Sequence, residues 1–141
     1  MPSTRASTVG ESAVDRFLAR ARAGLDRVEP EDLAGAQAAG ALVVDIRPDT
    51  YRLEEGELPG AVVVDRNHLE WWLDPTSDAA LPQVTPGQRA IIACNEGYAS
   101  SLAAATLRDL GVDATDLVGG YRAWFARARP SPSAAAEGHV A

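Results

Sequence analysis

The chain has 141 residues and a net charge of −7 at pH 7, from 13 Lys or Arg and 20 Asp or Glu. This length suffices for one domain with a hydrophobic core and is short for two. An acidic chain without a basic stripe repels nucleic-acid phosphates, so we expect no nucleic-acid partner.

The numbers of cysteines and histidines argue against an internal disulfide and against a metal site. The single cysteine, Cys94, excludes an internal disulfide, and the two histidines, His68 and His139, make a metal site improbable. No apolar run approaches the roughly 20 residues that cross a bilayer, and residues 1–10 lack the apolar core of a secretory signal. We therefore expect a cytoplasmic protein with no membrane partner, no metal and no cofactor.

Composition divides the chain into four segments. We expect a flexible N-terminus over residues 1–11, an amphipathic helix within 12–26, a folded domain over 27–129 and a disordered tail over 130–141. In the amphipathic helix, Ser12 is a plausible N-cap, and apolar residues recur at three- and four-residue spacings. This stripe is expected to be buried; it consists of Val14, Phe17, Leu18, Ala21 and Leu25.

Short apolar runs alternate with helical segments along residues 27–129. We expect strands at residues 27–29, 41–45, 61–64, 90–93 and 114–118, and helices at 30–39, 49–54, 102–110 and 121–128. Several of these strands are apolar without alternation, which is typical of burial on both faces. The order predicts an α/β fold with a parallel sheet and helices on both faces of the sheet.

Polar and reactive residues lie at or just past three of the expected strands: Asp45 and Arg47, Arg66, and Cys94. The carboxyl ends of parallel strands meet at one edge of the sheet, where α/β folds bind their ligands. We interpret Asp45 and Arg47 as an ion pair on this rim that ties loops together, and not as catalytic groups.

Cys94 stands where a buried strand ends and a short polar loop leads into a helix. Backbone N–H groups and the positive end of the helix dipole favour a thiolate at such a position. Gly97 permits a tight turn around the sulfur, and Tyr98 either shapes the mouth of a pocket or is an ordinary packed or exposed aromatic residue. We predict that Cys94 is a nucleophile; the alternative is a small buried residue without chemistry.

Four segments, in this order, resemble the rhodanese-like (sulfurtransferase) domain: residues 43–47 (VVDIR), 56–61 (GELPGA), 92–94 (IAC) with its loop, and 117–124 (LVGGYRAW). The resemblance covers about residues 27–129. It implies a five-stranded parallel sheet flanked by helices, and a catalytic cysteine, Cys94, that carries sulfur as a persulfide. The partners implied are a small-molecule sulfur donor and a thiol acceptor, or a protein acceptor. The substrate-binding residues expected are Asn95, Glu96, Gly97, Tyr98, Ala99, Ser100 and Arg66.

The chain departs from the family pattern in ways that affect the donor. Glu57 replaces a usual histidine, and Asn95 and Ala99 stand where the family often has arginines. A guanidinium would offer paired hydrogen bonds to an anion such as thiosulfate, whereas Glu96 would repel it. We therefore expect thiosulfate to be a poor donor. Arg66 either compensates by pointing over the site or pairs with a neighbouring carboxylate, Asp65 or Glu70.

Two other functions compete with sulfur transfer. A cysteine phosphatase shares the strand-loop-helix arrangement but needs an arginine six residues after the cysteine, where this chain has Ser100. The more serious alternative is a non-catalytic rhodanese-like module that binds or regulates a partner. We expect a sulfurtransferase, and the sequence does not identify its donor, its acceptor or its oligomeric state.

Overall fold

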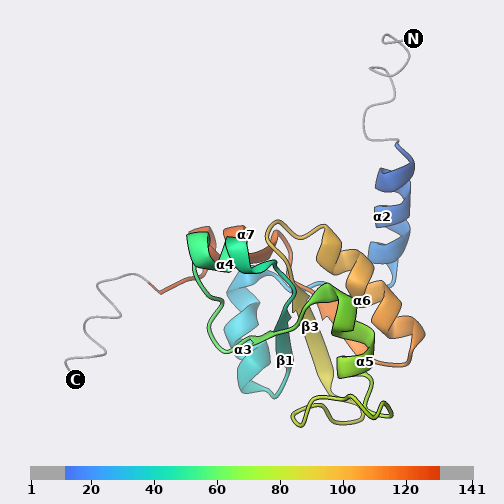
Figure 1. Cartoon of the computed structure of the whole chain (residues 1–141). Helices are drawn as coiled ribbons and strands as arrows, with labels where there is room; N and C mark the ends of the chain where they lie inside the picture. Colours follow the sequence, from blue (N-terminus) through green and yellow to red (C-terminus); the bar gives the residue numbers. More distant parts are fainter. Residues whose placement is uncertain (1–11, 131–141) are drawn as a thin grey trace, which may run out of the picture.

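The structure, a computed structural model, describes residues 12–130 (Figure 1). The flexible N-terminus expected at 1–11 and nearly all of the tail expected at 130–141 lie outside the described residues. Within residues 12–130, no helix has the length and apolar character needed to cross a membrane. The elements in chain order are α2 (Ala13–Ala23), η1 (Pro30–Asp32), α3 (Leu33–Ala38), β1 (Leu42–Asp45), α4 (Asp49–Glu55), β2 (Val62–Val63), η2 (Arg66–His68), α5 (Leu69–Leu73), β3 (Arg89–Ala93), α6 (Ala99–Asp109), β4 (Asp113–Asp116) and α7 (Gly120–Arg127).

The four strands form one parallel sheet in the order β2-β1-β3-β4. The prediction of five strands is therefore wrong for the described residues. The segment expected as the first strand forms only an isolated parallel bridge, between Val28 and Leu117. Because Pro30 has no backbone N–H and begins η1, the pairing stops after this single bridge.

Helices cover both faces of the sheet, and alternate strand residues point to opposite faces. On one side, Val44 and Ile92 pack in a cluster with residues of α5 and α6, among them the fully buried Leu107. On the other side, Val43 and Ile91 pack in a second cluster with residues of α3 and α7. The apolar runs of β1 and β3 are thus buried on both faces, as their lack of alternation predicted.

Helix α2 lies beside α6 and extends beyond the rest of the described fold (Figure 1). The prediction that its apolar stripe is buried is wrong for the first half of the stripe, since Val14 is 63% exposed and Phe17 is 53% exposed. None of the eleven residues of α2 is fully buried, although Leu25, just after the helix, packs against the core. Only the second half of the helix is partly covered, at Leu18, Ala21 and Arg22. The spacing established an amphipathic helix but not what covers its apolar side.

Candidate active site

The sulfur of Cys94 lies in a cradle of backbone amides directly after β3. The N–H groups of Gly97 and Ser100 donate to Sγ at 3.2 and 3.4 Å. The thiol donates to Ser100 Oγ at 3.3 Å. Helix α6 starts at Ala99, three residues before the expected start, so that Ser100 lies in its first turn. An amide of that turn is therefore free to donate to a negative sulfur.

The loop that carries Cys94 rests on the start of α7. The amide of Tyr121 donates to Cys94 O at 2.9 Å, and the amide of Arg122 donates to Asn95 O at 3.1 Å. The approach needs glycine, because a Cβ at Gly120 would lie 2.5 Å from Cys94 O. The backbone of Cys94 and Asn95 is thus fixed by main-chain contacts with the start of α7.

A cavity of about 370 Å³ opens above the sulfur. The loop after β3 supplies one wall of this cavity, and the segment from the end of β1 into α4 supplies another. The cavity is lined by Ile46, Arg47, Pro48, Tyr51, Arg66, Cys94, Asn95, Glu96, Tyr98 and Ala99. The structure therefore brings most of the expected substrate-binding residues to one opening, while Gly97 and Ser100 contact the sulfur through their amides. Tyr98, which is 60% exposed, stands at the mouth.

Arg66 combines the two placements expected for it. It lines the cavity, and its Nη1 also lies 2.9 Å from both carboxylate oxygens of Glu70. Its side chain is 43% exposed. A bound anion would therefore share this guanidinium with Glu70.

Asp45 and Arg47 form a buried ion pair, with Arg47 Nη2 2.9 Å from Asp45 Oδ2. Arg47 also donates to Gly56 O at 2.8 Å, and its guanidinium carbon lies 4.0 Å from the centre of the Tyr121 ring. Burial raises the pKa of the Tyr121 hydroxyl, which donates to Glu55 O at 2.7 Å. These contacts tie the end of β1 to α4 and α7 beside the cavity.

Asn95 and Glu96 face the acidic end of α4 and the first turn of α7. Asn95 Nδ2 donates to Glu55 Oε2 at 3.3 Å, while Arg122 pairs with Glu55 at 3.2 Å and with Glu96 at 3.6 Å. The hydrogen bond from Arg122 lowers the pKa of the Glu55 carboxyl. Glu57, which replaces the family's histidine, is not among the residues that line the cavity; it pairs with Arg52 at 3.4 Å.

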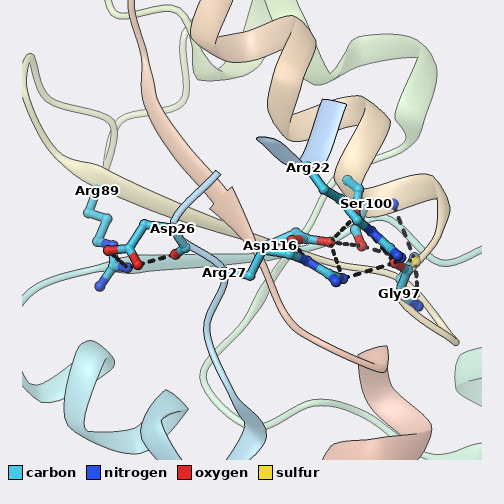
Figure 2. A network of polar contacts seen from close by, with 9 residues as sticks. Arg22, Asp26, Arg27, Arg89, Gly97, Ser100 and Asp116 are labelled. Atoms are coloured by element: carbon cyan, nitrogen blue, oxygen red, sulfur yellow. Dashed lines mark hydrogen bonds and ion pairs between the residues drawn. The ribbon is translucent and has the colours of Figure 1, made fainter. Parts of the chain in front are cut away.

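The sequence reading missed a charged network beneath the loop. Asp116, at the end of β4, is fully buried and accepts hydrogen bonds from Ser100 Oγ at 2.8 Å and Ser101 Oγ at 2.7 Å. Arg27 pairs with Asp116 at 2.8 Å, and Arg22 of α2 reaches the same loop (Figure 2). Asp116 could have been found, because it ends a strand as Asp45 does. Nothing in the local sequence pointed to Arg22.

Within residues 12–130, no group of three His, Cys, Asp or Glu side chains is placed to hold a metal ion. The nucleophile that the cavity offers is the sulfur of Cys94, and two backbone amides contact that sulfur.

Comparisons with known proteins agree with this arrangement. The sequence pattern of the Rhodanese-like domain matches residues 29–127. A protein of unknown function from Rhodopseudomonas palustris CGA009, described as a possible tyrosine phosphatase, is 28% identical with a TM-score of 0.75, over 85% of this chain and 94% of that one. A thiosulfate sulfurtransferase from Pseudomonas aeruginosa is 25% identical with a TM-score of 0.60, over 75% of this chain but only 19% of that one.

A human single-domain sulfurtransferase shares the fold, with 23% identity and a TM-score of 0.63 over 75% of this chain and all of that one. No curated protein matches the sequence. The family pattern covers well over half of the 141 residues, from residue 29 to the end of α7. The chain belongs to the rhodanese-like domain family.

Proposed function

We propose that the protein is a sulfurtransferase that carries sulfane sulfur as a persulfide on Cys94. The observation that carries this proposal is the pair of amides, from Gly97 and Ser100, that donate to Sγ at the base of an open cavity. Amides held in this way stabilise a negative sulfur, both as a thiolate and as a persulfide. Membership of a sulfurtransferase-type family supports the same chemistry.

The proposed reaction has two displacement steps. The Cys94 thiolate attacks the outer sulfur of a donor R–S–SH, a new S–S bond forms, and the electron pair of the broken S–S bond leaves with R–S⁻. The proton of the donor's SH stays with the transferred sulfur or passes to the leaving thiolate. An acceptor thiolate then attacks the outer sulfur of the persulfide, and the Cys94 thiolate is released. No oxidant or reductant is consumed.

The cavity favours an organic persulfide over thiosulfate as donor. The loop offers no guanidinium at positions 95 and 99, Arg66 is shared with Glu70, and Glu96 stands at the opening. Tyr51 and Tyr98 instead give the cavity aromatic walls suited to an organic group. The acceptor is a small thiol or a cysteine of another protein. Free thiols discharge persulfides, so the reaction suits a reducing compartment such as the cytoplasm.

A phosphatase activity is not favoured, although one similar protein is described as a possible tyrosine phosphatase. Phosphate binding in such a loop calls for an arginine six residues after the cysteine. In this chain Ser100 occupies that position, and its hydroxyl donates to the carboxylate of Asp116.

The test is the intact mass of the protein after exposure to glutathione persulfide, mercaptopyruvate or thiosulfate. We expect a gain of one sulfur atom from the organic persulfide, no gain in Cys94→Ser, and loss of the added sulfur on treatment with a thiol. Uptake from thiosulfate should be slower than uptake from glutathione persulfide by about ten- to a hundredfold, because the loop lacks a charge-assisted interaction with the thiosulfate anion. If no donor loads the protein, the chain is a non-catalytic rhodanese-like module.

A further inference from the structure

Arg22, near the end of α2, reaches across to the loop that holds the sulfur (Figure 2). Its Nη2 donates to Gly97 O at 2.7 Å, and its Nε donates to Ser101 Oγ at 3.0 Å. Its guanidinium carbon also lies 5.6 Å from the centre of the Tyr98 ring, at the mouth of the cavity. One side chain of α2 therefore contacts the tight turn at Gly97, the ring of Tyr98 at the mouth of the cavity, and Ser101 in the first turn of α6.

The contact with Gly97 O determines how the loop presents its amides. Arg27 Nη2 donates to the same oxygen at 3.2 Å. Two guanidinium groups hold this carbonyl, while the Gly97 N–H donates to Sγ. In a trans peptide the following N–H points opposite to the carbonyl, so the same contacts also orient the amide of Tyr98.

The network of Arg22, Arg27 and Asp116 has a net charge of one positive unit, which can balance a negative charge on the sulfur. Asp116 brings one buried negative charge close to Ser100, which by itself would disfavour a second anion. Arg27 compensates it with two hydrogen bonds, at 2.8 and 3.1 Å. Arg22 adds a second guanidinium, and among residues 12–130 it makes no ion pair with a carboxylate.

Both arginines precede the region that matches the family pattern, which begins at residue 29. The linker between α2 and η1, which carries Arg27, is nevertheless fixed to the sheet. Arg89 of β3 donates to Asp26 O at 3.3 Å, and Val28 forms the bridge to Leu117. The position of α2 relative to the loop is therefore built into the fold.

We propose that Arg22 and Arg27 are positioning residues, which hold the Gly97 carbonyl and supply the positive charge that balances an anionic sulfur on Cys94. The segment before residue 29 thus takes the place of the cationic groups that the loop itself lacks. The proposal rests on the proposed function only where it concerns the persulfide; its effect on the reactivity of the thiol is independent of any sulfur donor.

The test measures alkylation of Cys94 by iodoacetamide, which is uncharged, in the full chain. At pH 7 we expect Arg22→Ala to react about tenfold more slowly than the parent, the effect of one charge-assisted hydrogen bond. At a pH high enough to ionise the thiol in both proteins, the two rates should be equal. Arg20→Ala is the matched control, because it removes the same charge from α2 while Arg20 contacts the ring of Phe17; its rate should change less than twofold.

Arg22→Lys retains the charge but not the two-pronged contact, and we expect it to recover most of the rate at pH 7. Arg22→Gln retains much of the size without the charge and should behave as Arg22→Ala does, which separates charge from packing. Equal rates for parent and Arg22→Ala at pH 7, or an equal loss at both pH values, would overturn the proposal. Should no donor load sulfur onto the parent while the alkylation difference persists, the proposed function fails and this inference stands.

Discussion

Gly97 has a backbone conformation that makes the sulfur cradle possible. Its φ is +87°, a region that residues with a Cβ rarely adopt. A Cβ at this position would also lie 2.7 Å from Gly119 N and 3.0 Å from Gly119 Cα. Both atoms belong to the backbone at the start of α7, so they cannot move aside as a flexible side chain could. The amide of Gly97 can therefore reach Sγ only while residue 97 has no side chain.

We predict that Gly97→Ala lowers the rate of persulfide formation on Cys94 by at least about tenfold, because the loop must shift and an amide contact is lost. Gly111→Ala is the matched control: its φ is +88°, and nothing lies within 4 Å of the added Cβ. Both variants carry the cost of the left-handed conformation, about 1–2 kcal/mol. Sulfur uptake by mass spectrometry should fall only in Gly97→Ala, and an equal fall in both would contradict the role of the cradle.

Cys94 could be assigned to the site from the sequence, whereas Arg22 could not. Cys94 and its loop could be located because a strand end and a helix start are local patterns that place a residue at the rim of the sheet. Arg22 could not be located, because it lies 75 residues from Gly97 in sequence and no short-range pattern encodes their contact. Charged residues on a surface helix usually point into solvent, so Arg22 resembled any other arginine of α2.

The contact between α4 and α7 shows how elements support the site without lining it. Glu55 closes α4 and receives hydrogen bonds from Arg122 of α7 and from the side chain of Asn95. The hydroxyl of Tyr121 donates to the carbonyl of the same residue. Glu55 thus links two helices to the loop after β3, and its ionisation controls two of the three contacts.

We predict that protonation of Glu55 weakens this junction in acid. The hydrogen bond from Arg122 lowers the pKa of Glu55 below its ordinary value of 4.5. A lowered folded-state pKa means that the stabilisation is present above the unfolded-state value and is lost as the pH falls through the folded-state value. Glu55→Gln should therefore be less stable than the parent at neutral pH, and the difference should shrink below about pH 4.

The measurement is urea unfolding across pH. Glu54→Gln is the control, since it removes a carboxylate from the neighbouring, exposed position of α4. A stability difference between parent and Glu55→Gln that stays constant from pH 7 to acid would show that the Arg122 contact does not contribute through the charge of Glu55.

At the level of elements, the buried strands were predictable and the edges of the fold were not. β1 and β3 were located because continuous apolar runs leave no face for water. The segment at Val28 is flanked by Arg27, Glu29 and Pro30, so its pairing depends on a single bridge to Leu117 that periodicity does not report. For α2, spacing predicted the helix, but its contact with α6 is tertiary, and Val14 and Phe17 stay exposed.

The net charge of the whole molecule affects the rate at which a charged sulfur donor reaches the cavity. A net charge of −7 repels a dianion such as thiosulfate before it reaches the cavity. Raising the ionic strength from about 0.01 M to about 0.15 M shortens the screening length from about 30 Å to about 8 Å, which weakens this repulsion.

We predict that sulfur uptake from thiosulfate rises severalfold over this range of salt, whereas alkylation by uncharged iodoacetamide changes little. Stopped samples analysed by mass spectrometry give both rates on the same protein. A thiosulfate rate that falls with salt would mean that a positive patch near the opening, for which Arg66 is the obvious source, outweighs the overall charge.

Arg22 and Arg27 are not among the described residues that line the cavity, although both act on the sulfur through Gly97. A guanidinium group that holds a backbone peptide group stabilises negative charge on the sulfur without occupying the space in front of the sulfur. That space is then free for the part of a donor that is left behind after transfer. Discrimination among molecules that deliver an identical sulfur atom would accordingly depend on the bulk and shape of the portion that departs.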